Sequence, residues 1–225
     1  MQPECDDLRP RGVTNHMARI TIPERPLTSE QAFLEHMEAM RSGIGSAIDQ
    51  VMTCGPEHVI MGVALEAFWG GLAQSTALSE ELAARAGVGV TLGSDAMAAA
   101  ITAFGARRIA VLTPHQPRGD AMVRAWFEEA GFEVVRLKGL ACASPRLIAH
   151  TPPDDIRAAY RELDGDDVDA LVQVGTNLAG AQVAAEAERW LGKPTLSMNA
   201  ALYWRALRQL GVEDRIQGFG RLLEE

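Results

Sequence analysis

Short apolar runs alternate with amphipathic stretches along the chain, and this pattern predicts most of its elements. We expect strands where an apolar run is bounded by turn residues, at 13–22, 58–61, 88–92, 108–113, 133–138, 170–174 and 194–197. Between these runs, apolar residues recur every three or four positions, which is typical of helices. Strands that alternate with helices favour a parallel sheet covered by helices on both faces.

Caps and glycines set the expected bounds of the helices. The longest begins after Thr28 or Ser29 and runs to about Thr53, behind a proline-containing loop at 23–26. Further helices are expected at 3–10 (a helix or a turn), 68–78 with an interruption at 70–71, 79–87, 95–104, 120–130, 154–163, 180–191 and 200–210. Residues 144–150 are either a short helix or a loop.

Two pairs of segments repeat along the chain. TLGSDA (91–96) and TLSMNA (195–200) each lead into an alanine-rich helix, and HVIMGVAL (58–65) has the same build as ALVQVGTNLA (170–179). We therefore expect an α/β fold of two pseudo-symmetric lobes, each a small parallel sheet flanked by helices. Lobe 1 would comprise 1–94, completed by 206–225 whose tail (218–225) crosses back over it, and lobe 2 would comprise 95–205.

The repeat is incomplete at its start. The second copy opens with a strand at 108–113, a helix and a strand at 133–138, whereas the first copy begins with counterparts of that helix and of the second strand only. Either the first strand of lobe 1 is missing from this copy, or the reading frame starts at an internal methionine. We favour the second explanation, because losing a central strand would expose backbone donors and acceptors on its neighbours.

Composition narrows the class of protein. With 225 residues, 47% hydrophobic and 23% charged, the chain is typical of a soluble globular protein. No apolar run approaches the ~18 residues of a membrane span, and no signal peptide is evident. A net charge of −9 argues against nucleic-acid binding. Three cysteines at unrelated spacings indicate neither a disulfide framework nor a metal site. We expect a cytoplasmic protein, with a homo-oligomer left open.

Small polar residues follow the predicted strands. Ligands of such folds bind outside the carboxyl ends of the strands, where helix N-termini attract carboxylates or phosphates. The candidate binding residues are Gly62, Val63, Ala64, Thr113, Gly175, Thr176, Asn177 and Asn199, and His115 and Glu66 are the candidates for proton transfer. The nucleotide-binding glycine motifs are absent, so a small dicarboxylate fits these residues better.

Each candidate also has a simpler interpretation. Thr176, Asn177 and Asn199 could cap helices, His115 could be an exposed loop residue, and Glu66 could be a solvated glutamate in a first helical turn. Cys142 could be an inert buried thiol. The aromatic residues at 68, 69, 126 and 127 are most simply core residues.

The chain resembles the aspartate/glutamate racemase superfamily, in its branch of maleate cis-trans isomerases and arylmalonate decarboxylases. The resemblance rests on HVIMGVALEAFWGG, RIAVLTPHQPRGD, DALVQVGTNLAG, LSMNAALYWRALRQLG and GFGRLL, in that order. It implies two pseudo-symmetric lobes around a site without a cofactor. In that family, backbone N–H groups and Ser, Thr or Asn side chains hold the substrate carboxylates.

Three positions depart from the family pattern. Racemases and maleate isomerases use one cysteine in each lobe, at positions that match Gly62 and Gly175 here, and the decarboxylases keep the second. A tyrosine common in the family is His115. The residues therefore do not support two-thiol chemistry. Decarboxylation stays open, because positioned donors can stabilise the developing anion without a nucleophile.

We therefore expect a cofactor-independent isomerase or decarboxylase acting on a small dicarboxylate. Thr176, Asn177 and Asn199 would hold carboxylates, Gly62 and Gly175 would offer backbone N–H groups, and His115 or Glu66 would handle the proton. The alternative is a catalytically impaired relative that binds a carboxylate metabolite without turnover. A third class is an oligomeric scaffold without a ligand.

Overall fold

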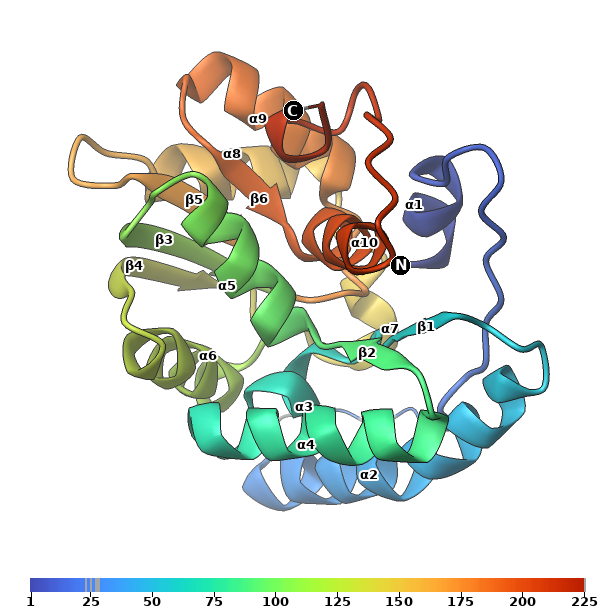
Figure 1. The fold of residues 1–225 in the computed structure, drawn as a ribbon. Coiled ribbons are helices and arrows are strands. Elements are labelled where there is room, and N and C mark those ends of the chain that lie inside the picture. The colour runs from blue at the N-terminus through green and yellow to red at the C-terminus, as the bar shows by residue number, and fades with distance from the viewer. Residues whose placement is uncertain (23, 25, 27–28, 225) are drawn as a thin grey trace.

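The computed structural model describes residues 1–22, 24, 26 and 29–224, and it confirms the α/β class with two parallel sheets (Figure 1). The larger sheet has the strand order β4-β3-β5-β6, formed by Glu133–Gly139, Arg108–Thr113, Ala170–Gln173 and Thr195–Ser197. The smaller sheet pairs β1 (His58–Ile60) with β2 (Gly89–Thr91). The expected division into two lobes, each with a small parallel sheet flanked by helices, therefore holds.

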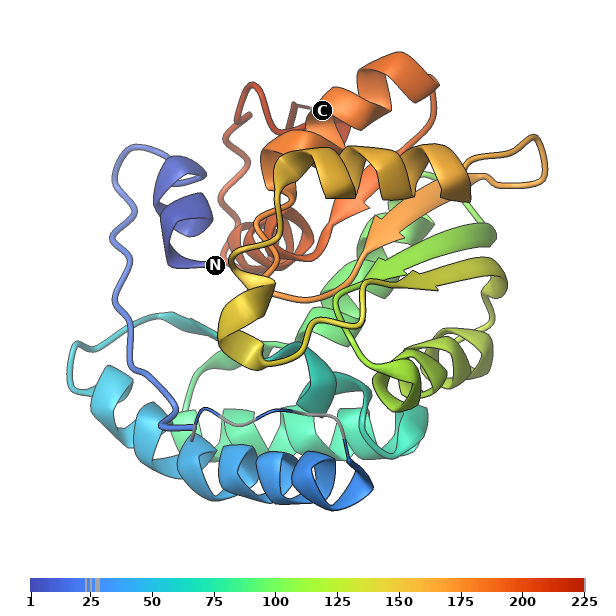
Figure 2. The same cartoon turned by 180° about the vertical axis from the view of Figure 1, so that it is seen from behind.

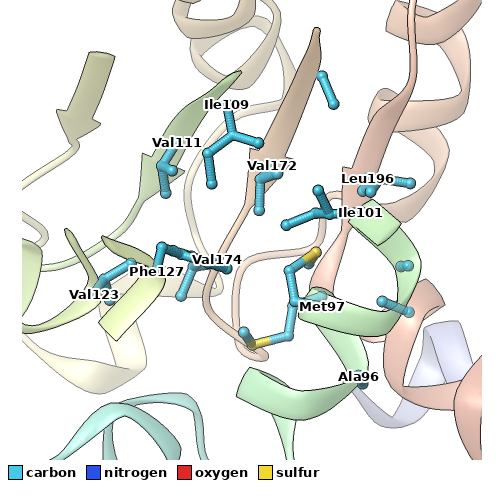
Figure 3. Close-up of a cluster of buried hydrophobic side chains, with 14 of the residues drawn as sticks. Ala96, Met97, Ile101, Ile109, Val111, Val123, Phe127, Val172, Val174 and Leu196 are labelled. Carbon is cyan, nitrogen blue, oxygen red and sulfur yellow. The ribbon is translucent and has the colours of Figure 1, made fainter. Parts of the chain in front are cut away.

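Alternate residues of the larger sheet point to opposite faces, as the period of two requires. Ile109, Val111 and Val172 pack on one face against α5 (Gly93–Ala103) and α6 (Pro117–Glu129), and Figure 3 shows Met97 and Ile101 of α5 in this cluster. On the other face, Ala110, Leu112 and Leu171 pack against α8 (Pro153–Leu163) and α9 (Ala181–Leu191). A sheet buried on both faces explains why its strands are apolar throughout.

The smaller sheet is covered by different helices. Ile44 and Ile48 of α2 (Glu30–Met52) and Leu82 of α4 (Gly71–Ala86) pack with Val90 of β2. On another side, Ile60 of β1 lies against the cluster formed by α1 (Gln2–Asp7) and α10 (Met198–Gln209). The helix α10, which follows the larger sheet, therefore helps to bury the smaller one.

The two repeated segments lead into the two helices that each pack against the sheet of the other lobe. TLGSDA contains the end of β2 and the start of α5, and TLSMNA contains β6 and the start of α10. α5 packs on the larger sheet and also on α10. The aromatic residues Phe68, Trp126 and Phe127 form a further contact between the lobes, with ring centroids 5.4–5.6 Å apart. The prediction that the aromatic residues at 68, 126 and 127 are core is confirmed, since none is more than 1% exposed, whereas Trp69 is only half-buried.

The predicted strand at 13–22 is wrong. Within the described residues, this segment joins no sheet, and in Figure 2 it runs as an irregular trace at the edge of the molecule between α1 and α2. Two of its apolar residues still pack inward, Val13 and Ile20 against two different clusters, whereas Met17 is exposed. A strand needs a hydrogen-bonded neighbour, and none of the described strands lies beside this segment.

Two further predictions need correction. α4 runs without a break from Gly71 to Ala86, so Ser79 begins no new helix. The helix predicted over 68–78 is instead the end of α3 (Ala64–Phe68) and the start of α4. The uncertain stretch 144–150 contains the short helix α7 (Pro145–Ile148). The other predicted helices and strands are present, with ends that differ by a few residues.

Some predictions fall outside the described residues. Pro23 of the proline-containing loop and Thr28, one of two candidate caps, are among them, whereas Ser29 caps α2 by accepting the N–H of Ala32 at 3.1 Å. The tail forms α11 (Arg221–Glu224), which lies against α10, and Arg221 contacts the ring of Phe104 and the carboxylate of Glu188. Across the described part of the chain, every helix is too short or too polar to cross a bilayer.

Candidate active site

Two loops that follow strands of the two different sheets meet. The first loop tip (residues 62–64) follows β1, and the second loop tip (residues 175–177) follows β5. The Thr176 hydroxyl donates a hydrogen bond of 2.7 Å to the carbonyl oxygen of Gly62. The carboxyl ends of the parallel strands therefore face each other across the junction of the lobes, where ligands of such folds bind.

A cavity of ≈ 1370 Å³ opens at this junction and extends along β1 and the segment before α2. Its lining includes the predicted residues Gly62, Val63, Ala64, His115, Gly175, Thr176 and Asn177. Glu66, Thr113 and Asn199 were predicted as site residues and are not part of the lining. The fold thus brings most of the candidates together around one space, although they come from distant parts of the chain.

Both loop tips present unused backbone donors. Within the described part of the chain, the N–H groups of Gly62, Val63, Thr176 and Asn177 donate no hydrogen bond. Thr176 and Asn177 lie at the bend of a turn closed by the Leu178 N–H on the Gly175 carbonyl at 3.2 Å. The Gly175 N–H lies 3.4 Å from the Met198 sulfur, a weak acceptor. Clustered free N–H groups attract anions such as carboxylates.

The two glycines at the loop tips are under different constraints. Gly175 has a φ of +110°, and an added Cβ would lie 2.7 Å from the ring of Pro114, so a side chain there is strained and also blocked. At Gly62 the backbone is ordinary, and an added Cβ would meet only the flexible end of the Met1 side chain. The second loop tip is therefore built around the absence of a side chain at position 175.

His115 is buried at the cavity rather than exposed in a loop, so its simpler interpretation is wrong. Its backbone N–H donates to the Thr113 hydroxyl at 3.1 Å, and its Nε2 has no partner among the described residues. Burial lowers the pKa of His115 to about 4, because desolvation disfavours the charged imidazolium. The imidazole is therefore neutral at neutral pH, and its unpartnered Nε2 is itself buried.

Thr113 supports the backbone at His115 without lining the cavity. Its hydroxyl donates to the Asp120 carboxylate and accepts the N–H of His115. Burial raises the pKa of Asp120, and the Thr113 hydrogen bond acts in the opposite direction. Thr113 thus fixes the backbone at His115 from outside the cavity lining.

Glu66 is buried in an ion pair, so it is not the solvated glutamate of the simpler interpretation. Its Oε1 lies 2.6 Å from Nε of Arg41, whose guanidinium lies 5.0 Å from the centre of the Trp69 ring. Its Oε2 has no partner within the described residues. This arrangement joins α3 to α2 beside the first loop tip.

The two asparagines already use their amide hydrogens within the protein. Asn199 donates to the Glu4 carboxylate at 2.5 Å and to the Thr176 carbonyl at 2.9 Å. Asn177 donates to the Pro145 carbonyl at 2.7 Å. In this arrangement the side chains shape the second loop tip, and its backbone supplies the free donors.

Sequence reasoning missed one buried residue of the cavity and gave little weight to another. His36 of α2 lines the cavity, and burial lowers its pKa. Its signal was a histidine on the apolar stripe of α2, beside Phe33, Met37 and Met40. Cys142 also lines the cavity, half-buried, with its sulfur 3.7 Å from the Thr151 hydroxyl. Over the described residues, the side chains of His, Cys, Asp and Glu do not gather into a metal-binding group.

Comparison with known proteins gives consistent matches. The profile of the family described as arylmalonate decarboxylase matches residues 35–223. A maleate isomerase of Nocardia farcinica is 27% identical over 197 residues, covering 85% of this chain and 78% of the relative. An arylmalonate decarboxylase of Bordetella bronchiseptica is 27% identical over 172 residues, covering 74% of this chain and 70% of the relative.

Solved structures show the same fold. The maleate cis-trans isomerase of Nocardia farcinica superposes with a TM-score of 0.89 at 24% sequence identity, covering 99% of this chain and 90% of that chain. The two loop tips and the cavity between them therefore lie within a fold that extends over almost the whole chain.

Proposed function

Because this chain belongs to the arylmalonate decarboxylase family, we propose that it is a cofactor-independent enzyme that acts on a small dicarboxylate between its two lobes. The family also explains why relatives named for isomerisation and for decarboxylation match the same chain. Of these two reactions, the residues at the loop tips favour decarboxylation of a substituted malonate.

The observation that carries the proposal is the junction of the loop tips. The Thr176–Gly62 hydrogen bond holds them together, and the four residues with free N–H groups line the cavity at this junction. When a malonate loses carbon dioxide, the bond from the α-carbon to one carboxyl carbon breaks and its electron pair moves into the remaining carboxylate. Fixed N–H donors stabilise the resulting enediolate, since they need no reorganisation during the reaction.

The absence of thiols at the loop tips argues against isomerisation by thiol addition. Gly175 has no room for a side chain, and Gly62 carries none. Cys5 is buried in the cluster of α1 and α10, and burial raises its pKa to about 11, so it holds its proton. Cys142 lines the cavity on the loop after β4 and belongs to neither loop tip.

His115 is a better candidate than Glu66 for the group that transfers the proton. It lines the cavity and has a free Nε2, whereas Glu66 is ion-paired outside the lining. After carbon dioxide leaves, the α-carbon of the enediolate takes the ring N–H proton of the neutral imidazole, and the imidazolate that remains takes a proton from water and leaves hydroxide. Glu66 would then support the first loop tip through Arg41.

The test is turnover of two substrate types by the purified protein. A malonate with one aryl or alkyl substituent and, separately, maleate are followed by proton NMR in D₂O. We expect the malonate to lose carbon dioxide and to gain one deuterium at its α-carbon, and maleate to remain unchanged. Conversion of maleate to fumarate would contradict the choice of reaction, and binding of either acid without turnover would favour the impaired relative.

Replacement of His115 tests its role. His115→Gln removes the proton carrier and should lower kcat at least a hundredfold, in the range typical of a general acid. Arg107→Gln, at an exposed position outside the cavity lining, is the control. Unchanged turnover in His115→Gln would remove this histidine from the mechanism and leave the carboxylate site untouched.

A further inference from the structure

Glu4 links the N-terminal helix to the second loop tip, although it is not part of the cavity lining. From α1, its Oε1 accepts the N–H of Ala181, the first residue of α9, at 2.7 Å. Its Oε2 accepts an N–H of Asn199, at the start of α10, at 2.5 Å. The negative charge is favourable at the N-terminus of α9, where the helix dipole is positive.

The hydrogen bonds continue from Glu4 to both loop tips. Asn199, which is 1% exposed, gives its other amide hydrogen to the carbonyl of Thr176 at 2.9 Å. The hydroxyl of Thr176 then reaches the carbonyl of Gly62 at 2.7 Å. One continuous chain of contacts therefore runs from Glu4 through Asn199 and Thr176 to Gly62.

A carboxylate suits the first position of this chain better than any neutral group. Its two partners, the Ala181 N–H and the Asn199 amide, are both donors, and a carboxylate accepts through both oxygens. A glutamine of the same size has one accepting oxygen and one NH₂ group, so it would place a donor against a donor. One of the two partners would then be left without its hydrogen bond.

We infer that Glu4 is a positioning residue that holds the two loop tips in register through Asn199 and Thr176. Without Glu4, the Asn199 amide is free to rotate away from the Thr176 carbonyl, and the turn at 175–177 loosens. The backbone donors at the loop tips then spend less time aligned for a carboxylate. The consequence for catalysis rests on the proposed function, whereas the link between Glu4 and the loop tips does not.

The link itself is tested by hydrogen exchange, which needs no substrate. Glu4→Gln should speed amide exchange about tenfold at Leu178, whose N–H closes the turn of the second loop tip on the Gly175 carbonyl and which Glu4 does not contact. Tenfold is the factor expected for one lost charge-assisted hydrogen bond. Asp7→Asn, at an exposed position of the same helix, is the matched control for losing an acid there. Faster exchange in α1 alone, with Leu178 unchanged, would overturn the inference.

The functional consequence is tested by the division between KM and kcat. Because the loop tips would hold the carboxylate before the reaction and stabilise the enediolate during it, Glu4→Gln should raise KM and also lower kcat, so that kcat/KM falls about tenfold or more. A residue that only stabilised the fold would lower the fraction of active enzyme, and hence kcat, at unchanged KM. Glu4→Asp, which keeps the charge, should recover part of the loss.

Failure of this inference and failure of the proposed function give different results. If the wild type turns over no dicarboxylate while Glu4→Gln still speeds exchange at Leu178, the link stands and the proposed function falls. If the wild type is active and Glu4→Gln leaves exchange and KM unchanged, the inference falls and the proposed function stands.

Discussion

At the candidate active site, Gly175 has a tightly constrained backbone. Its φ of +110° disfavours any side chain, and Pro114 occupies the space that a Cβ would need. We expect Gly175→Ala to lower the free energy of unfolding by about 1–3 kcal/mol. Gly62→Ala should lower the free energy of unfolding by less, because the added Cβ would meet only the Met1 side chain, which is free to move. Urea denaturation measures the change in unfolding free energy for both variants. Equal changes would contradict the conclusion that position 175 is more constrained than position 62.

His115 predicts a pH dependence of stability. Its pKa falls from 6.5 in the unfolded chain to about 4 in the folded protein, so the unfolded chain binds the proton more readily. Its contribution to stability is therefore complete above pH 6.5 and is lost as the pH falls towards 4, by about 3 kcal/mol in all.

The measurement is the difference in unfolding free energy between wild type and His115→Gln from pH 7 to pH 4. We expect the wild type to lose more stability than the variant over this range. His16→Gln, at an exposed position, should follow the wild type. Parallel curves for wild type and His115→Gln would show that His115 takes up its proton equally well in both states.

At the scale of elements, one hydrogen bond fixes how α4 packs on α6. The indole N–H of Trp126 donates to the Ser75 hydroxyl at 2.9 Å, and the two side chains are 1% and 0% exposed. Ser75→Ala leaves the indole N–H buried without a partner, which costs about 1–3 kcal/mol. Thermal unfolding measures this loss, with Ser46→Ala at an exposed position of α2 as the control. A shift no larger than that of Ser46→Ala would show that another acceptor replaces Ser75.

At the scale of the whole molecule, the lobes share their core. α10 follows the larger sheet and packs against the smaller one, and Phe68 of α3 lies in the same cluster as Trp126 and Phe127 of α6. We therefore expect one cooperative unfolding transition. Far-ultraviolet circular dichroism and tryptophan fluorescence should then give the same urea midpoint. Two separated midpoints would indicate that the lobes unfold independently.

The sequence by itself determined the features that depend on local pattern. The apolar run Arg108–Thr113 is β3 with the predicted bounds, and the paired TLGSDA and TLSMNA segments are equivalent strand-to-helix junctions. The loop tips could be predicted for the same reason, because a glycine directly follows an apolar run in each, with Thr176 and Asn177 next to it in the second. Each of these features depends on residues a few positions apart, so the local sequence pattern is sufficient to predict it.

Only the tertiary structure decided the features that depend on distant partners. Residues 13–22 have the pattern of a strand, but a strand forms only beside a hydrogen-bonded neighbour, and the described residues supply none there. Glu66 gains its role from Arg41, and Asn199 from Glu4, which is 195 positions away in the chain. Burial and hydrogen-bond partners are set by the packing of the two lobes, so local sequence does not reveal which polar side chain faces the cavity and which supports it.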